Sequence, residues 1–281
     1  MSKLTIMKMQ KMKERGEKIV MATAYDVPTS RLAAAAGIDL LLVGDSLGQV
    51  ILGYDSTVPV TVEDMIHHGK AVVRGAEGRF VILDMPYGSY HISEEDTLRN
   101  GVRMIKETGA DALKVEGLRE IAPKVRALRR AGIPVVGHIG LTPQTTTILG
   151  GHRVQGKSRQ EAARLIEAAS ALEEAGAMML VLECVVTEVA DTITAHASIP
   201  TIGIGAGSGC DGQVLVFHDL LGLNDQFQPV FLQKFADLRP ATIAGLEAYA
   251  KAVREETFPD AAHAFPLDEE DKEAIWPLLK K

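Results

Sequence analysis

Short apolar runs alternate with longer amphipathic stretches along most of the 281-residue chain. The runs are rich in valine, isoleucine and leucine, and nearly every position within them is apolar. Such runs are typical of parallel strands that are covered on both faces. The runs that we predict to be strands are 19–23, 40–43, 80–83, 112–116, 134–137, 179–183, 200–204 and 214–217.

The stretches between these runs carry the signals of helix ends. Three segments have the spacing of a capping box, in which the first side chain accepts from the backbone three residues on: Thr61 with Asp64, Ser93 with Asp96, and Ser158 with Glu161. Three glycines stand just before the next apolar run, where a left-handed residue commonly ends a helix: Gly109, Gly132 and Gly176. We therefore expect helices between the strands.

The alternation amounts to about eight β/α repeats, with no linker or change of composition between them. This count predicts an α/β fold, a closed (β/α)₈ TIM barrel, which forms one domain of roughly 250 residues. An open, doubly wound parallel sheet is the alternative. We assign the barrel to residues 1–256 and a charged, proline-containing C-terminal extension to residues 257–281.

The composition excludes several classes of protein. The chain is 46% hydrophobic, which argues against disorder, and its net charge of −7 argues against binding nucleic acid. No apolar run approaches the roughly 20 residues of a membrane span, and residues 1–18 are too polar for a secretion signal. Cys184 and Cys210 form no CxxC motif, so we expect a cytoplasmic protein without a thiolate zinc site.

Ionisable residues recur where five consecutive predicted strands end. Asp45 follows the second run and Asp84 the third, and Glu116, His138 and Glu183 end the fourth, fifth and sixth. In a barrel, the carboxyl ends of the strands form the active site, so this pattern predicts one.

Lys114 and Glu116 are two residues apart and therefore share one face of their strand. If Val115 packs against the helices, both charged side chains point into the barrel. A buried lysine and glutamate are costly unless each is paired or ligated.

Asp45, Asp84 and Glu116 come from three adjacent strands and would converge near one point. Carboxylates that are crowded together repel unless a cation neutralises them. Oxygen ligands without cysteine favour Mg²⁺ or a similar ion, with waters or substrate oxygens completing the shell. We predict such a metal site, and the alternative is that these carboxylates cap helices or lie in loops.

Glu183 follows a fully apolar run, apart from the predicted metal cluster. Loss of hydration there would suit a general base. The alternative is a glutamate that is paired with a neighbouring basic residue.

Residues 207–212 match the pattern GxGxxG. The motif opens the last repeat rather than the first βαβ unit of a dinucleotide domain. We therefore expect tight turns, or a close approach of the backbone to a ligand, and no dinucleotide site.

Nine short segments are distinctive when they are taken together and in order. They are 44–48, 52–57, 59–61, 84–86, 114–117, 137–144, 182–184, 202–207 and 218–222. In these segments the chain resembles the ketopantoate hydroxymethyltransferase (3-methyl-2-oxobutanoate hydroxymethyltransferase) family over roughly residues 3–255. It departs from the family pattern at Gln49, at His152–Arg153 and at Val186, and it matches poorly beyond Thr257.

The resemblance implies a barrel of the phosphoenolpyruvate/pyruvate superfamily type with one Mg²⁺ ion per subunit. The family's motif residues correspond here to Asp45, Asp84 and Glu116 as metal ligands and to Glu183 as the catalytic base. The keto-acid contacts that the resemblance implies are Asp45, Ser46, Asp84, Lys114 and His138. Family members are typically homo-oligomers, decamers built as a pentamer of dimers.

The activity that the resemblance implies is the transfer of a hydroxymethyl group from 5,10-methylenetetrahydrofolate to 3-methyl-2-oxobutanoate. The products are 2-dehydropantoate and tetrahydrofolate, in the first step of pantothenate and coenzyme A biosynthesis. We expect Mg²⁺ to stabilise the enolate of the keto acid while Glu183 takes the proton at C3. Lys114 would pair with the substrate carboxylate, and Ser46 would orient it.

Two other functions stay open at this point. Metal-stabilised enolates also serve lyases and phosphonopyruvate-type mutases on the same barrel. A catalytically silent, metal-bound oligomeric scaffold is the third possibility. The charged residues argue against a scaffold, because it has no reason to keep unpaired charges inside a barrel.

Overall fold

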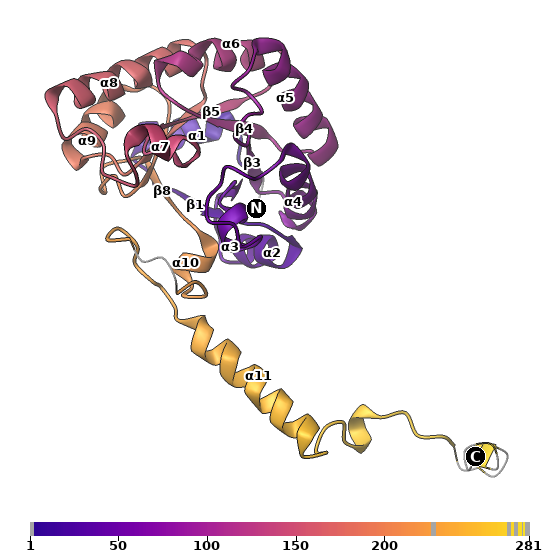
Figure 1. Cartoon of the computed structure of the whole chain (residues 1–281). Coiled ribbons are helices and arrows are strands. Elements are labelled where there is room, and N and C mark those ends of the chain that lie inside the picture. Colours follow the sequence, from indigo (N-terminus) through magenta and orange to yellow (C-terminus); the bar gives the residue numbers. More distant parts are fainter. Residues whose placement is uncertain (1–2, 226–228, 269–270, 273–274, 277, 279–281) are drawn as a thin grey trace.

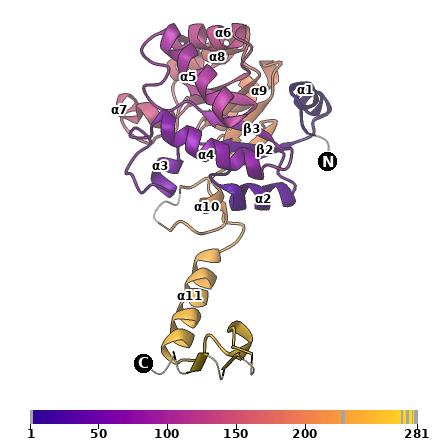
Figure 2. The same cartoon turned by 90° about the vertical axis from the view of Figure 1, so that its right-hand side faces the viewer.

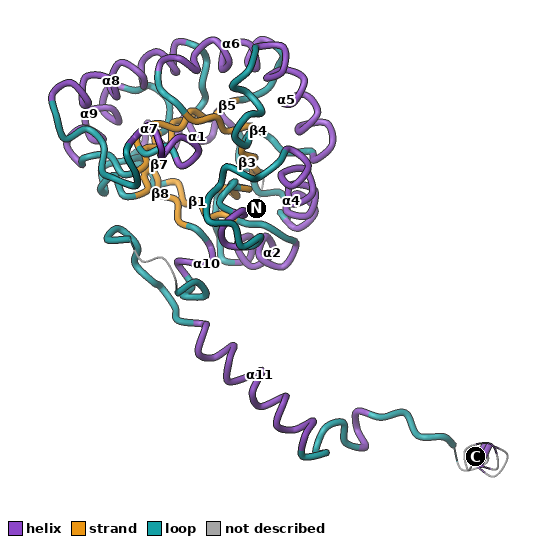
Figure 3. Tube along the Cα trace, in the orientation of Figure 1, coloured by secondary structure: helices purple, strands orange, loops and turns teal. Residues whose placement is uncertain are grey.

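Eight parallel strands close into a barrel that is surrounded by helices, as Figures 1 and 3 show. The computed structural model describes residues 3–225, 229–268, 271–272, 275–276 and 278. The strands are β1 Ile19–Thr23, β2 Leu40–Val43, β3 Phe80–Asp84, β4 Ala112–Glu116, β5 Val135–Gly140, β6 Met179–Glu183, β7 Thr201–Ile204 and β8 Gly212–Leu215. Each strand pairs with the next, and β8 pairs with β1, so the closed barrel is confirmed and the open sheet is wrong.

Two of the predicted strands were displaced. Strand β5 runs to Gly140 instead of ending at Gly137, and β8 begins at Gly212 instead of Val214. Both differences arise where glycine or a polar residue interrupts the apolar pattern, and main-chain pairing continues through them. Gly140 pairs with Glu183, and Gly212 pairs with both Ile19 and Ile202.

Helices connect the strands and cover the outside of the barrel. They are α1 Ile6–Arg15, α2 Val27–Ala35, α3 Leu47–Val50, α4 Val62–Gly75, α5 Glu94–Thr108, α6 Ala122–Arg130, α7 Thr146–Leu149, α8 Arg159–Glu174, α9 Thr187–His196, α10 Phe217–Leu220 and α11 Leu238–Arg254. Short 3₁₀ turns are η1 Arg119–Ile121, η2 Pro143–Thr145 and η3 Ala261–His263.

Most of the predicted helix ends are confirmed. Reciprocal capping boxes begin α4 at Thr61 and α8 at Ser158. Ser93 caps α5 by accepting from the backbone of Asp96, but it donates its hydroxyl to that carboxylate, so the reciprocal half of the box is missing. The glycines at 109, 132 and 176 all have positive φ angles, as expected before the next strand.

Successive side chains of each strand point alternately into the barrel interior and toward the surrounding helices. Leu40, Phe80 and Ile82 belong to the interior cluster, whereas Leu41 and Leu83 belong to the outer cluster under the helices. Met9 of α1 joins the interior cluster, which also contains Ile19, Leu40 and Phe80 at the starts of their strands. Helix α1 therefore closes the amino end of the barrel, and the carboxyl ends of the strands face the opposite side.

The glycines of the GxGxxG segment allow close packing between elements. A Cβ at Gly207 would meet the Thr187 side chain, and one at Gly209 would collide with the Asp191 carboxylate. A Cβ at Gly212 would collide with the backbone carbonyl of Ile19. These contacts support the expectation of tight turns.

Helix α11 projects away from the barrel in both views (Figures 1 and 2), and none of its residues is buried. The boundary that we placed at residue 256 stays a prediction. In the portion of the chain that is described, no helix combines the length and the apolar character needed to cross a membrane.

The close approach at Gly212 generates a test of the barrel closure. Gly212→Ala should lower the free energy of unfolding by about 1–3 kcal/mol, because its Cβ would push β8 away from β1. Gly245→Ala is the matched control, because open space surrounds Gly245 in α11 and alanine favours a helix. Urea unfolding measures both variants, and equal stability of Gly212→Ala and the wild type would contradict the predicted collision.

Candidate active site

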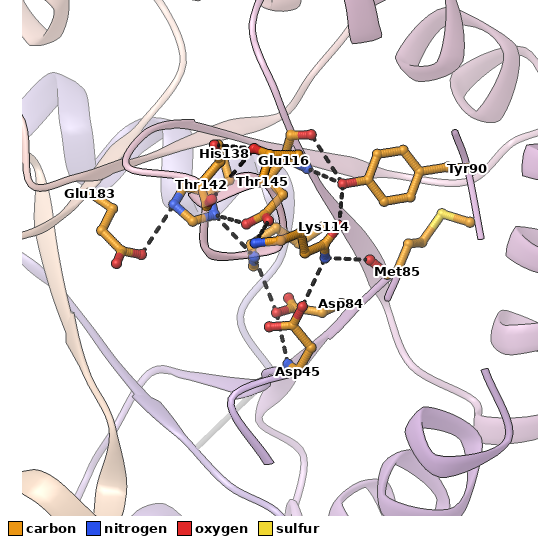
Figure 4. A network of polar contacts seen from close by, with 11 residues as sticks. Asp45, Asp84, Met85, Tyr90, Lys114, Glu116, His138, Thr142, Thr145 and Glu183 are labelled. Atoms are coloured by element: carbon orange, nitrogen blue, oxygen red, sulfur yellow. Dashed lines mark hydrogen bonds and ion pairs between the residues drawn. The ribbon is translucent and has the colours of Figure 1, made fainter. Parts of the chain in front are cut away.

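The polar side chains at the carboxyl end of the barrel continue the inward alternation of the strands (Figure 4). After Phe80 and Ile82, the next inward position on β3 is Asp84. Strand β4 supplies Lys114 and Glu116 in the same way, following Ala112. The prediction that Lys114 and Glu116 share the inner face is confirmed, because Val115 lies in the outer cluster.

Asp45 and Asp84 lie beside each other at the ends of β2 and β3. The backbone N–H of Asp45 donates to Asp84 Oδ2 at 3.1 Å, and Lys114 Nζ forms an ion pair with the same oxygen at 3.1 Å. Asp84 Oδ1 is buried and has no hydrogen-bond partner among the described residues. A buried oxygen of this kind is one that a ligand can use.

The two aspartates are electrostatically unfavourable in the absence of a cation. Burial, and then repulsion from Asp84 and Glu116, raises the pKa of Asp45 well above its usual range. Burial also raises the pKa of Asp84, although Lys114 opposes the shift. A divalent cation would relieve this repulsion, and oxygen ligands suit Mg²⁺. The Asp45–Asp84 pair therefore fits such an ion.

Glu116 is engaged by protein groups at both of its oxygens. The backbone N–H of Gln144 donates to Oε1 at 2.6 Å, and His138 Nδ1 lies 3.1 Å from Oε2. Burial would raise the pKa of Glu116, but His138, Lys114 and the Gln144 backbone together lower it. In the described part of the chain, no three acidic, histidine or cysteine side chains are arranged to hold a metal together. A third ligand at Glu116 stays a prediction.

Lys114 is the central cation of the site. Burial alone would lower the pKa of Lys114, but Asp84, Glu116 and Asp45 together raise it above its usual value. The side chain therefore stays an ammonium. Its Nζ also lies 3.2 Å from His138 Nδ1.

His138 on β5 lies between Glu116 on β4 and Glu183 on β6, the two strands that flank its own. Burial and Lys114 lower the pKa of His138, but the Glu116 and Glu183 carboxylates raise it to about 9. The ring is therefore an imidazolium at neutral pH, so its Nδ1–H faces the Glu116 carboxylate as an ion pair and cannot accept from Lys114. His138 Nε2 lies 3.2 Å from Glu183 Oε2, which is an ion-pair distance without the geometry of a hydrogen bond.

Glu183 ends β6, four strands from β2 and so on the opposite wall of the eight-stranded barrel. Its side chain is 17% exposed, whereas that of Glu116 is 1% exposed. The loss of hydration that we expected is therefore incomplete. Glu183 is paired with a basic neighbour, His138, as the alternative interpretation required.

The backbone after Glu183 is unusual. Cys184 has a φ of 49°, a left-handed conformation that is uncommon outside glycine. The Glu183 carbonyl accepts from the Leu141 N–H, and the Cys184 carbonyl accepts from the Gln155 N–H. Burial, and then Glu183, raises the pKa of the Cys184 thiol to about 12, so this cysteine is not a thiolate nucleophile.

Sequence reasoning missed Gln144 and Tyr90, which are both buried at this site. Gln144 Nε2 donates to Asp45 Oδ2 at 2.8 Å and to the Met85 carbonyl at 3.0 Å. The Tyr90 hydroxyl lies 2.7 Å from Gln144 Oε1 and 3.0 Å from the Glu116 carbonyl. Gln144 thus orients Asp45 and Glu116 together. The available signals for Gln144 were its position in the loop after β5 and its place in segment 137–144, one of the segments that resemble the family.

Tyr25, another residue that sequence reasoning missed, contacts the serine that was predicted to bind the keto acid. Its hydroxyl lies 2.8 Å from Ser46 Oγ, and Ser46 itself is half-buried directly after Asp45. The structure therefore brings together all the predicted site residues, with Ser46 at the margin of the group.

The repulsion at Asp45 generates a prediction about stability. A carboxyl group whose pKa is raised by folding destabilises the fold increasingly as the pH rises above its unfolded value. In the presence of a chelator at pH 7, Asp45→Asn should therefore raise the free energy of unfolding by roughly 1–2 kcal/mol. The gain should shrink as the pH falls toward 3.8.

Chemical denaturation between pH 4 and pH 8 measures this gain, with Asp55→Asn as the matched control at an exposed aspartate. An Asp45→Asn protein no more stable than the wild type at pH 7 would show that Asp45 is not under electrostatic strain.

Known protein sequences are similar to this chain over nearly its whole length. Residues 3–261 match the model of the ketopantoate hydroxymethyltransferase family. A relative from Moorella thermoacetica, named 3-methyl-2-oxobutanoate hydroxymethyltransferase, is 56% identical over 264 residues, or 94% of this chain and 98% of the relative. One of the same name from Heliobacterium modesticaldum is 55% identical over 270 residues, covering 96% and 98%.

Solved structures with low identity share the fold. A phosphoenolpyruvate phosphomutase from Streptomyces platensis subsp. rosaceus superposes with a TM-score of 0.61 at 13% identity, covering 99% of this chain and 97% of that one. A 2,3-dimethylmalate lyase, described as a PEP mutase/isocitrate lyase superfamily member, has a TM-score of 0.57 at 19% identity, covering 94% and 90%. These structures share the barrel fold with this chain, and the sequence matches show that the chain belongs to the ketopantoate hydroxymethyltransferase family.

Proposed function

We propose that this chain transfers a hydroxymethyl group from 5,10-methylenetetrahydrofolate to 3-methyl-2-oxobutanoate, giving 2-dehydropantoate and tetrahydrofolate. The names of its relatives support the reaction. The observation that carries the proposal is the position of Glu183 on the barrel wall opposite Asp45 and Asp84. A small keto acid between the two walls would have its oxygens toward one and its C3 toward the other.

Cationic side chains suit the carboxylate of the keto acid. The Lys114 ammonium is buried and, among the described residues, forms one ion pair, with Asp84, so it can pair with a bound carboxylate as well. Ser46 Oγ, which is held by Tyr25, is positioned to donate a hydrogen bond to the same carboxylate. These two residues would orient the substrate in the site.

Asp45 and Asp84 would hold the Mg²⁺ ion that the family resemblance implies. Asp84 Oδ1 supports this assignment because it is buried without a hydrogen-bond partner in the described part of the chain. Glu116 would either bind the ion directly or orient Asp45 through Gln144, which contacts both carboxylates. When bound, the ion would polarise the keto group and make the C3 proton more acidic.

Glu183 would act as the general base. Its carboxylate takes the proton from C3, while the His138 imidazolium, 3.2 Å away, holds one carboxylate oxygen in position. The C3 carbon then forms a bond to the one-carbon unit, which leaves the folate nitrogens. One water is consumed in the overall reaction, and its oxygen becomes the hydroxyl of the product.

The setting of the reaction belongs to the same proposal. We place the enzyme in the cytoplasm, and the free thiols of Cys184 and Cys210 support this location. We place its reaction at the first step of pantothenate and coenzyme A biosynthesis. We also propose that it forms a decamer, a pentamer of dimers. Apolar side chains exposed on α11, including Leu246 at 64% and Tyr249 at 59%, support an assembly larger than one chain.

The role of Glu183 is tested by deuterium exchange at C3 of 3-methyl-2-oxobutanoate without folate. Glu183→Gln should lower the exchange rate by at least about a hundredfold, because the amide cannot accept the proton. Binding of the keto acid, measured by calorimetry, should stay within about threefold. Glu188→Gln, on the exposed side of α9, is the matched control.

Undiminished exchange in Glu183→Gln would remove this residue as the base. Turnover of the keto acid by the wild type without folate would instead favour a lyase.

The metal site is tested by calorimetric titration with Mg²⁺. Asp84→Asn should weaken Mg²⁺ binding at least about tenfold, because an uncharged amide replaces a hard anionic ligand. Glu116→Gln keeps an oxygen that can accept from the Gln144 N–H, so it should weaken Mg²⁺ binding clearly less. Full affinity in Asp84→Asn would refute the assignment, and equal losses in both variants would make Glu116 a direct ligand.

A further inference from the structure

Ser46 stands at the start of a helix but does not cap it. It precedes α3 with helical backbone angles, φ −53° and ψ −17°, and among the described residues its side chain caps no backbone N–H of that helix. A serine that begins a helix ordinarily accepts a hydrogen bond from the backbone two or three residues on. The Ser46 hydroxyl is therefore available for another contact.

The residues before Ser46 leave room for this hydroxyl inside the barrel. After Leu40 and Leu42, the next inward position on the same wall is Gly44. A Cβ at Gly44 would lie 2.8 Å from Ser46 Oγ and 3.6 Å from Asp84 Oδ2. The serine hydroxyl thus takes the space of the side chain that Gly44 lacks, close to the Asp84 carboxylate.

Tyr25, whose hydroxyl lies 2.8 Å from Ser46 Oγ, is held by three other elements. Its backbone N–H donates to Thr29 Oγ1 of α2 at 3.2 Å, and its carbonyl accepts from His68 Nδ1 of α4 at 2.7 Å. His218 of α10 stacks on its ring, with centroids 5.7 Å apart. The residue is only 1% exposed, so the phenol has little freedom to move away from Ser46.

The phenol of Tyr25 keeps its proton at neutral pH. Burial raises the pKa of Tyr25, and side-chain contacts with Ser46 and Thr23 oppose this shift without cancelling it. The negative charges of Asp219 and Asp84 raise the pKa further. Tyr25 is therefore able to donate a hydrogen bond as well as to accept one.

A bound carboxylate fixes the direction of the hydrogen bond between the two hydroxyls. An ionised carboxylate only accepts, so a Ser46 that contacts it must direct its single hydrogen toward it. The Tyr25 hydroxyl then donates to Ser46 Oγ. Hydrogen bonds that run in one direction polarise one another, so the bond from Tyr25 strengthens the bond from Ser46.

We propose that Tyr25 is a positioning residue for the carboxylate of the keto acid. It acts through Ser46, because it holds that hydroxyl in place and keeps the hydroxyl hydrogen directed at the substrate. This inference rests on the proposed function, in which Ser46 contacts the carboxylate.

A double-mutant cycle tests the connection between the two hydroxyls. Tyr25→Phe removes only the phenol oxygen and should raise the Kd for 3-methyl-2-oxobutanoate, measured by calorimetry with Mg²⁺ present, about fivefold. Ser46→Ala should raise the same Kd at least about tenfold, because a hydrogen bond to a charged group is lost. Adding Tyr25→Phe to Ser46→Ala should change the Kd by less than about twofold, because the phenol then has no hydroxyl to orient.

Two measurements exclude a general effect on the fold. Tyr87→Phe is the matched control, because Tyr87 is 46% exposed in the loop after β3, and it should bind the keto acid as the wild type does. The Kd for Mg²⁺ in Tyr25→Phe should stay within about twofold of the wild-type value. A loss of keto-acid affinity in Tyr87→Phe, or of Mg²⁺ affinity in Tyr25→Phe, would refute the specific role of Tyr25.

The outcomes distinguish this inference from the proposed function. If Ser46→Ala weakens keto-acid binding but Tyr25→Phe does not, Tyr25 is not a positioning residue and the proposed function stands. If the two losses multiply in the double variant, Tyr25 acts independently of Ser46 and the inference is refuted in the same way. If Ser46→Ala binds the keto acid as tightly as the wild type, the proposed contact of Ser46 fails, and this inference fails with it.

Discussion

The mutual attraction of buried charges at the mouth of the barrel determines how the site is built. Four carboxylates at the ends of different strands lie around one ammonium and one imidazolium, and the nearby opposite charges offset part of the cost of burying them. Lys114 holds Asp84, and His138 holds Glu116 and Glu183. Each cation thus faces two carboxylates, and the two halves differ in burial, because Asp45 and Asp84 are both buried whereas the Glu183 side chain is 17% exposed.

The pair of buried aspartates is where a further cation would be most favourable. Asp45 and Asp84 share the single charge of Lys114, and burial raises the pKa of both. Gln144 and Tyr90 prevent the carboxylates from turning away, because their hydrogen bonds join Asp45 to Glu116 and to the Met85 backbone. The repulsion is therefore kept in a rigid arrangement, which favours a ligand that removes it.

The sequence predicted the barrel and much of the site because both follow from alternation along strands. Asp84, Lys114, Glu116, His138 and Glu183 continue apolar positions that the interior requires, so their convergence could be expected. The engagement of Glu116 by Gln144 could not, since it depends on how a loop 28 residues away closes over the mouth. The ends of β5 and β8 were also missed, because glycines pair through their backbone and leave no apolar signal.

The left-handed backbone at Cys184 affects which sequences can keep this site. A non-glycine residue in that conformation costs of order 1 kcal/mol, and a β-branched one costs more. The turn aims the two carbonyls that tie the end of β6 to Leu141 and Gln155. Position 184 therefore tolerates only residues that can adopt this turn, although the side chain at this position takes no part in the chemistry. The orientation of Glu183 thus depends on the main-chain conformation of the residue that follows it.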